Sequence, residues 1–183
     1  MQSKKISKYL ILSLGLLSTS LVVEKVFATN PDSATLEAIV GPSVNITLSA
    51  SDIALDVNPV NKPFDSTDIT AEITTNSTDG YNLYLYSDNT SLVNQNYSGK
   101  TIDTLPTSDS GYDETNFLSD KWGYKIGDAN YHGLVSGAVI SSSDGPVDKD
   151  EANLTFGAKV SNNTAAGSYN GTLVFRAIAI VST

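Results

Sequence analysis

The chain has 183 residues with 20 acidic and 11 basic side chains, which gives a formal net charge of −9 at pH 7. This surplus of negative charge repels nucleic-acid phosphates and anionic lipid headgroups, and it argues against nucleic acid as a partner. The sequence contains no cysteine, which excludes a disulfide framework and a cysteine-linked lipid anchor and favours a bacterial or archaeal source for an exported chain.

The first 28 residues have the pattern of an export signal. A basic start, KKISK at 4–8, precedes the apolar run YLILSLGLLSTSLVV at 9–23. This run is shorter than the roughly 20 apolar residues of a membrane-spanning helix, and VFA at 26–28 has the small-residue pattern of a signal-peptidase site. The sequence predicts a signal helix at 1–28 that is cleaved during general secretion to the cell surface or medium, leaving no stable transmembrane segment. An uncleaved anchor is the alternative.

Residues 29–42, TNPDSATLEAIVGP, stand apart from the regular pattern that follows them. Leu36, Ala38 and Val40 alternate as they would in a strand that one subunit donates to the sheet of another. An extended N-terminal arm of this kind would support self-association, whereas an ordinary first edge strand explains the same pattern. We expect the remainder, 43–183, to form a single domain.

From Pro42 onward, apolar residues recur at every second position, which is typical of half-buried strands. We expect strands over 44–48, 53–57, 69–73, 81–87, 154–160 and 169–181, with shorter ones in 121–127 and 133–140 and loops elsewhere between 87 and 153. The last of the long strands has apolar residues on both faces near its end, which predicts burial on both sides.

Turn signals between these segments predict the topology. The pair Asp79-Gly80 favours a hairpin between 69–73 and 81–87, because glycine adopts a positive φ without steric cost. Many short strands without a helical period predict an all-β fold, namely an antiparallel β-sandwich of the Ig-like or jelly-roll-like kind. A small barrel is the alternative.

Three stretches carry a resemblance to a known group of proteins: VGPSVNITLSASDIALDVNP, ITAEITTNSTDGYNLYLYSDN and NLTFGAKVSNNTAAGSYNGTLVFRAIAI. Their layout resembles small exported β-sandwich surface proteins of bacteria. The C-terminal stretch is similar to the closing strand of WxL-type cell-wall-binding domains and of fimbrial sandwiches. The resemblance implies a β-sandwich at the cell surface. The only tryptophan, Trp122, lies outside the closing strand, where a WxL domain carries its Trp-x-Leu pairs.

Tyrosines form the candidate contact surface. Within YNLYLY, Leu83 shares a face with Leu85, whereas Tyr84 and Tyr86 share the other face. With the leucines in the core, these tyrosines face outward beside the predicted hairpin partner. A platform for a glycan could also include Trp122, Tyr124 and Tyr131, because aromatic rings stack on sugars. In the alternative interpretation, Trp122 is a core anchor and the chain's own 88–120 segment covers the tyrosines.

Two further features are candidates for a metal site and a catalytic site. Asp144, Asp148, Asp150 and Glu151 crowd one stretch with the hard oxygen ligands that Ca²⁺ prefers, although a solvated acidic loop has the same composition. The single histidine, His132, lies outside any nucleophile motif. We therefore expect no catalysis.

Together these patterns predict a non-catalytic, secreted or cell-surface protein with an adhesion or envelope-structural role. Its partner would be an envelope glycan or a surface protein. The alternatives are a pilin-like, self-assembling subunit and a carbohydrate-binding module.

Overall fold

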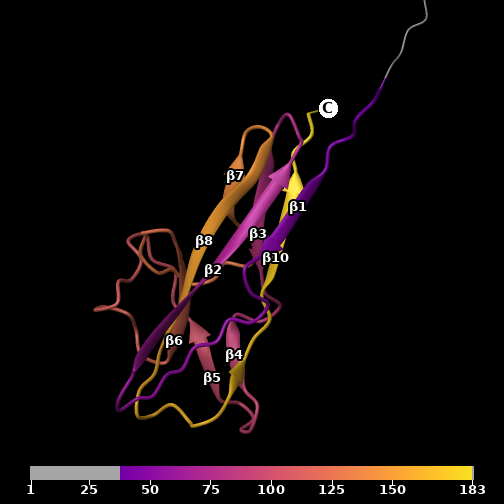
Figure 1. Ribbon diagram of the computed structural model, residues 1–183. Helices are drawn as coiled ribbons and strands as arrows, with labels where there is room; N and C mark the ends of the chain where they lie inside the picture. Colours follow the sequence, from indigo (N-terminus) through magenta and orange to yellow (C-terminus); the bar gives the residue numbers. More distant parts are fainter. Residues whose placement is uncertain (1–37, 183) are drawn as a thin grey trace, which may run out of the picture. The chain divides into compact units, whose positions relative to one another are not determined.

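The computed structural model describes residues 38–182 and divides the chain between Val40 and Gly41, with every strand in the part that begins at Gly41. The described residues form ten strands and no helix, so the predicted all-β class is confirmed for them (Figure 1). Hence none of them forms a helix of the length and apolarity that crossing a bilayer requires. The predicted signal peptide at 1–28 and most of the predicted arm at 29–42 lie outside the described residues.

A seven-stranded sheet curls into a half-barrel. The order of its strands is β1 (Val44–Leu48), β2 (Phe64–Thr75), β8 (Val147–Lys159), β6 (Lys121–Ile126), β5 (Thr101–Thr104), β4 (Ser91–Asn94) and β9 (Tyr169–Asn170). The pair β5–β6 is parallel and all other neighbours are antiparallel. The prediction of a purely antiparallel fold is therefore wrong at this pair, because the long connection 105–120 lets the chain cross over and re-enter in the same direction.

A second sheet has three antiparallel strands in the order β10 (Val174–Ala179), β3 (Tyr81–Tyr86) and β7 (Ala138–Ser143). Strand β6 confirms the short strand expected over 121–127, whereas β7 begins five residues later than the strand expected over 133–140 and runs to Ser143. Strands β4 and β5 lie in a stretch for which loops were predicted. Both of these are only four residues long, too short for a period of two to stand out.

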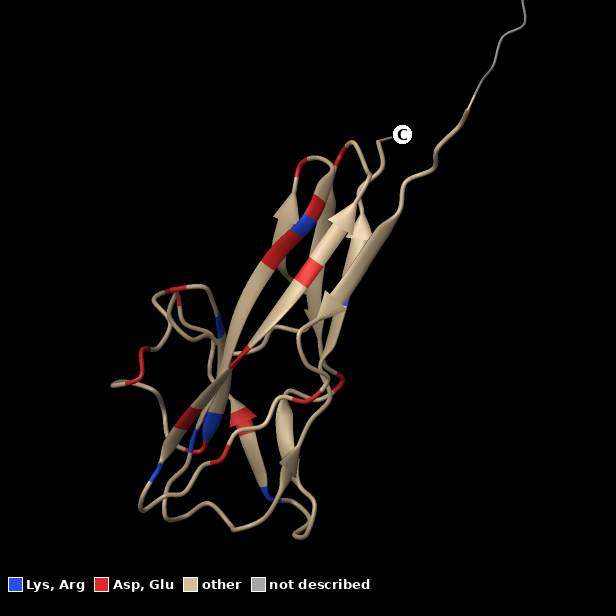
Figure 2. Ribbon diagram, in the orientation of Figure 1, with Lys and Arg blue, Asp and Glu red and all other residues tan. Residues whose placement is uncertain are grey.

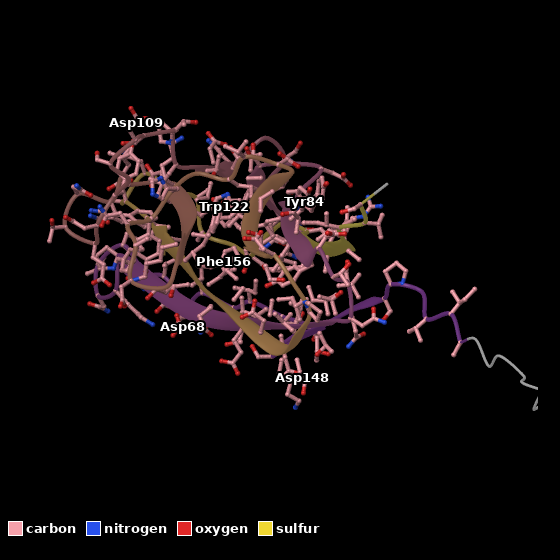
Figure 3. All side chains as sticks on the ribbon, turned by 90° about the horizontal axis from the view of Figure 1, so that it is seen from above. Asp68, Tyr84, Asp109, Trp122, Asp148 and Phe156 are labelled. Atoms are coloured by element: carbon pink, nitrogen blue, oxygen red, sulfur yellow. The ribbon has the colours of Figure 1, made fainter. Side chains whose placement is uncertain are left out.

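The two sheets share one hydrophobic core. Ile73 from β2 and both Leu83 and Leu85 from β3 are fully buried in it, and Phe156 of β8 lies between the ribbons (Figure 3). Each such side chain contributes about 1.5–3 kcal/mol by leaving water. The alternation of the sequence explains this arrangement, because β2, β3 and β8 each bury the face on which their apolar residues gather.

The predicted hairpin does not form. Strands β2 and β3 lie in different sheets, and the turn between them carries the chain from one sheet to the other. Gly80 has the positive φ expected there, +81°, and a Cβ at this position would lie 1.9 Å from the carbonyl oxygen of Ser143. The turn prediction thus holds while the pairing is wrong. A period of two identifies the buried face of each strand and does not identify its hydrogen-bonded neighbour.

Two other strand predictions need correction. The segment 53–57 is extended and its alternate side chains pack on the core, but it joins no ladder. The predicted strand 169–181 is interrupted and forms β9 and β10 in different sheets. Its second apolar face is not buried, because Val174 and Ile178 are 50% and 39% exposed.

A polar contact links the two sheets within the core. Tyr81 of β3 is 0% exposed, and its hydroxyl donates to Asp150 of β8 at 2.6 Å and lies 3.1 Å from the Ser141 hydroxyl of β7. Asp150 reaches this position because it stands opposite Ile73 and shares its inward face. A bulge next to this pair, in which Lys149 has a φ of +61°, adjusts the register of β8.

The carboxylate of Asp120 holds the loop that follows β8 in place. Asp120 accepts hydrogen bonds from the backbone N–H of Ser161 at 2.8 Å, the Ser161 hydroxyl at 2.9 Å and the Thr164 hydroxyl. Burial opposes the charge, yet the hydrogen bonds from Thr164 and Ser161 hold the pKa of Asp120 below its usual value of 3.8. Asp120 also has a φ of +61°, which is uncommon for a residue other than glycine.

Candidate contact surface

The outer side of the three-stranded sheet is the main candidate site, and we call it the tyrosine face. Side chains directly opposite one another in antiparallel strands point to the same side. The registers therefore place on this side Asn82, Tyr84 and Tyr86 of β3, Val174, Arg176 and Ile178 of β10, and Val139 and Ser142 of β7.

Large apolar groups on this face are open to solvent. Val139 and Val174 are about half exposed, at 51% and 50%. Tyr84 and Tyr86 are half-buried, and their ring centroids lie 6.0 Å apart with an interplanar angle of 35°. Tyr86 lies against Gly137, where a Cβ would be 3.1 Å from the ring. The two rings therefore form a nearly continuous aromatic surface.

The neighbours of the tyrosines differ from those predicted. Tyr84 stands opposite Arg176 of β10 and Val139 of β7, and not beside strand β2. In the 88–120 segment, strands β4 and β5 belong to the seven-stranded sheet. These strands thus do not pair with the three-stranded sheet, and its outer valines remain open to solvent.

Charge separates this face from the rest of the surface. Strands β3, β7 and β10 contain no acidic residue, and their single charged side chain is Arg176, the only arginine in the chain. No carboxylate of residues 38–182 lies within ion-pair distance of this exposed arginine. Acidic residues occur instead along β2 and β8, among other places (Figure 2), and Glu72 stands opposite Glu151. In Figure 3, Tyr84 and Asp148 lie on opposite sides of Phe156.

The other three aromatic candidates are buried. Trp122, Tyr124 and Tyr131 are 3%, 8% and 1% exposed, so they do not extend the tyrosine face. The indole of Trp122 donates to the Thr90 carbonyl at 2.8 Å, which fits the alternative of a core anchor. Burial raises the pKa of Tyr124 and of Tyr131 above the ordinary value of about 10.

The four candidate calcium ligands are not brought together. Asp150 points inward to Tyr81, whereas Glu151 points outward, and Asp144 and Asp148 are exposed in and beside the β7–β8 turn. Within 38–182, no three histidine, cysteine or acidic side chains converge as a metal site would require. The alternative of a solvated acidic stretch fits Asp144 and Asp148.

A cavity of about 330 Å³ lies elsewhere, between the loop 112–115 and the segment 125–131. Its lining includes Asp113, Glu114, Asp128 and Lys125, and the Lys125 ammonium lies 5.1 Å from the centre of the Tyr131 ring. The carboxylate of Asp113 already accepts hydrogen bonds from the backbone and side chain of Thr115. Because Asp113 and Lys125 already have partners within the chain, the cavity is a weaker candidate than the tyrosine face.

Sequence reasoning missed the part of the tyrosine face that β10 contributes, namely Val174, Arg176 and Ile178. One signal was available: these residues alternate on one face of the closing segment, and Arg176 is the only arginine in an acidic chain. The pairing of β10 with β3, which brings them to the tyrosines, has no counterpart in the local pattern.

No protein-family model matches the chain, and no curated protein matches its sequence. One similar solved structure is a family 123 glycoside hydrolase from Clostridium perfringens, with a TM-score of 0.37 and 16% sequence identity. The match covers 76% of this chain and 25% of the hydrolase chain, so the chain spans about a quarter of that structure.

Proposed function

We propose that this chain is an exported, non-catalytic protein that acts at or outside the cell surface by contact through its tyrosine face. The observation that carries the proposal is the open strip formed by Tyr84, Tyr86, Val139 and Val174 on one sheet. Contiguous apolar surface on a folded domain is a candidate interaction site, because water solvates it poorly. The proposed role is adhesion or envelope structure.

The fold and the N-terminus support this proposal. The shared core of the two sheets fits a β-sandwich, an architecture that leaves the outer faces of both sheets available for contacts. The basic and apolar pattern of residues 1–28 fits general secretion. Mass spectrometry of the protein from its own cells should find an N-terminus at Thr29.

Co-sedimentation with the envelope of the producing cells tests the proposal. The double variant Tyr84→Ser/Tyr86→Ser should lose most of the binding, because it removes the aromatic surface and leaves the buried face of β3 unchanged. Glu72→Gln, on the acidic outer side of the other sheet, is the matched control and should bind like the parent protein. Equal binding by all three proteins would reject the tyrosine face as the contact surface.

Exposed apolar residues before β1 favour the pilin-like subunit as a second candidate. Ile39 and Val40 are 88% and 81% exposed, and β1 is an edge strand. A donated strand would cover such residues in another subunit. If this candidate is correct, the chain from Thr29 forms large assemblies in gel filtration and a chain from Ser43 is monomeric. A monomer in both cases would reject it.

A further inference from the structure

We infer that the tyrosine face binds an acidic glycan, specifically a polysaccharide whose sugar rings carry carboxylate groups. This inference rests on the proposed function and identifies the chemistry of the partner. Three observations carry it: an exposed arginine that forms no ion pair with any carboxylate of residues 38–182, the tilted tyrosine pair and the small size of the face.

Arg176 gives the face its preference for an anion. It is exposed, it stands opposite Tyr84, and no acidic residue occurs in the three strands around it. A guanidinium presents a planar fork of N–H donors that matches a carboxylate in a bidentate pair. A protein with a net charge of −9 repels anions in general, so an anionic partner is favoured only away from acidic side chains, which these three strands lack.

The tyrosines favour sugar rings. Tyr84 and Tyr86, at 6.0 Å and 35°, present two ring surfaces in sequence along one strand. Such rings bury the apolar face of a flat ligand and keep their hydroxyls in water for hydrogen bonds. In a polymer of sugar acids, the stacked ring and the carboxylate belong to the same unit, so one residue of the glycan engages Tyr84 and Arg176 together.

The area of the face argues against a protein partner. Three strands about 4.8 Å apart and six residues long at about 3.3 Å per residue span roughly 14 by 20 Å, or about 280 Å². A stable protein interface buries about 800 Å² on each partner. A short stretch of glycan matches the available area.

Affinity electrophoresis in gels containing polygalacturonate tests the inference. Polygalacturonate should retard the parent protein, and its methyl-esterified form should retard it at least about 10-fold less, because esterification removes the charge and keeps the rings. Poly-glutamate, which has carboxylates without rings, should give no retardation. Arg176→Gln should weaken binding to polygalacturonate by about 10-fold or more. Arg176→Lys should bind polygalacturonate more weakly than the parent protein and more tightly than Arg176→Gln, because lysine keeps the positive charge and lacks the planar guanidinium fork.

Lys100→Gln is the matched control, because it removes one exposed positive charge from a loop of the other sheet. It should bind like the parent protein. The inference is overturned if polygalacturonate gives no retardation, if the esterified polymer or poly-glutamate binds equally well, or if Arg176→Gln behaves like Lys100→Gln. In these cases the proposed function still stands if Tyr84→Ser/Tyr86→Ser abolishes envelope binding, so the two failures are distinguishable.

Discussion

The contact between Tyr81 and Asp150 gives the sharpest test of how the two sheets are held together. Tyr81→Phe keeps the buried ring and removes only the hydroxyl. Because that hydroxyl donates to Asp150 at 2.6 Å, the 3.1 Å contact with Ser141 has the serine as donor. The substitution thus leaves both a carboxylate and a serine hydroxyl without their partner.

The expected cost follows from these two bonds. A hydrogen bond to a charged group contributes about 1.5–3 kcal/mol, and a neutral bond about 0.5–1.5 kcal/mol. Ser141 and Asp150 are each half-buried, so water replaces part of what they lose. We expect Tyr81→Phe to lower the free energy of unfolding by about 2 kcal/mol. In a domain of this size, that corresponds to a decrease of about 4–8 °C in Tm.

Urea unfolding monitored by the fluorescence of Trp122, which is buried, provides the assay. Tyr84→Phe, on the outer face, is the matched control and should change stability by less than about 0.5 kcal/mol. A double-mutant cycle with Asp150→Ala should show a coupling of at least about 1 kcal/mol. If Tyr81→Phe costs no more than the control, or if the coupling is absent, the link between the sheets does not stabilise the fold.

Three further predictions concern stability. Asp120→Ala should lower the free energy of unfolding by about 1.5–3 kcal/mol. Because the pKa of Asp120 is lowered in the folded state, the parent protein should lose this contribution as the pH falls below 3.8, and the variant should lose less stability in that range. Gly80→Ala should lower the free energy of unfolding by about 3 kcal/mol or more, or prevent folding, because the new Cβ would collide with the backbone. Gly145→Ala is the control and should unfold at nearly the parent's urea concentration, because a Cβ there meets nothing within 4 Å. Equal urea midpoints for the two variants would contradict the turn geometry. Burial raises the pKa of Tyr81 and of Tyr131, so urea midpoints should be constant between about pH 6 and pH 10 and fall above that range. A midpoint that stays level through about pH 12 would contradict the burial of these two hydroxyls.

The sequence predicted the buried side of the strands where the alternation was clear. Leu83 and Leu85 are in the core and Tyr84 and Tyr86 are outside, as predicted. The positive φ of Gly80 was likewise readable from its turn chemistry. These features depend on residues close together in the chain, because side-chain direction alternates strictly along a strand and a turn is defined by four residues.

The partners of the strands were decided only in the tertiary structure. An apolar face is buried equally well against many other faces, so the pattern that identified β2 and β3 did not show that they lie in different sheets. The same limit hid the pairing of Tyr84 with Arg176, which are 92 positions apart in sequence, and the inward turn of Asp150 at the β8 bulge. The alternation of the chain thus determined which residues could form a contact surface. Long-range strand pairing decided that Tyr84 and Tyr86 share this surface with Arg176, the only arginine. The sequence pattern could not show this, because the pairing depends on how all the apolar faces pack at once.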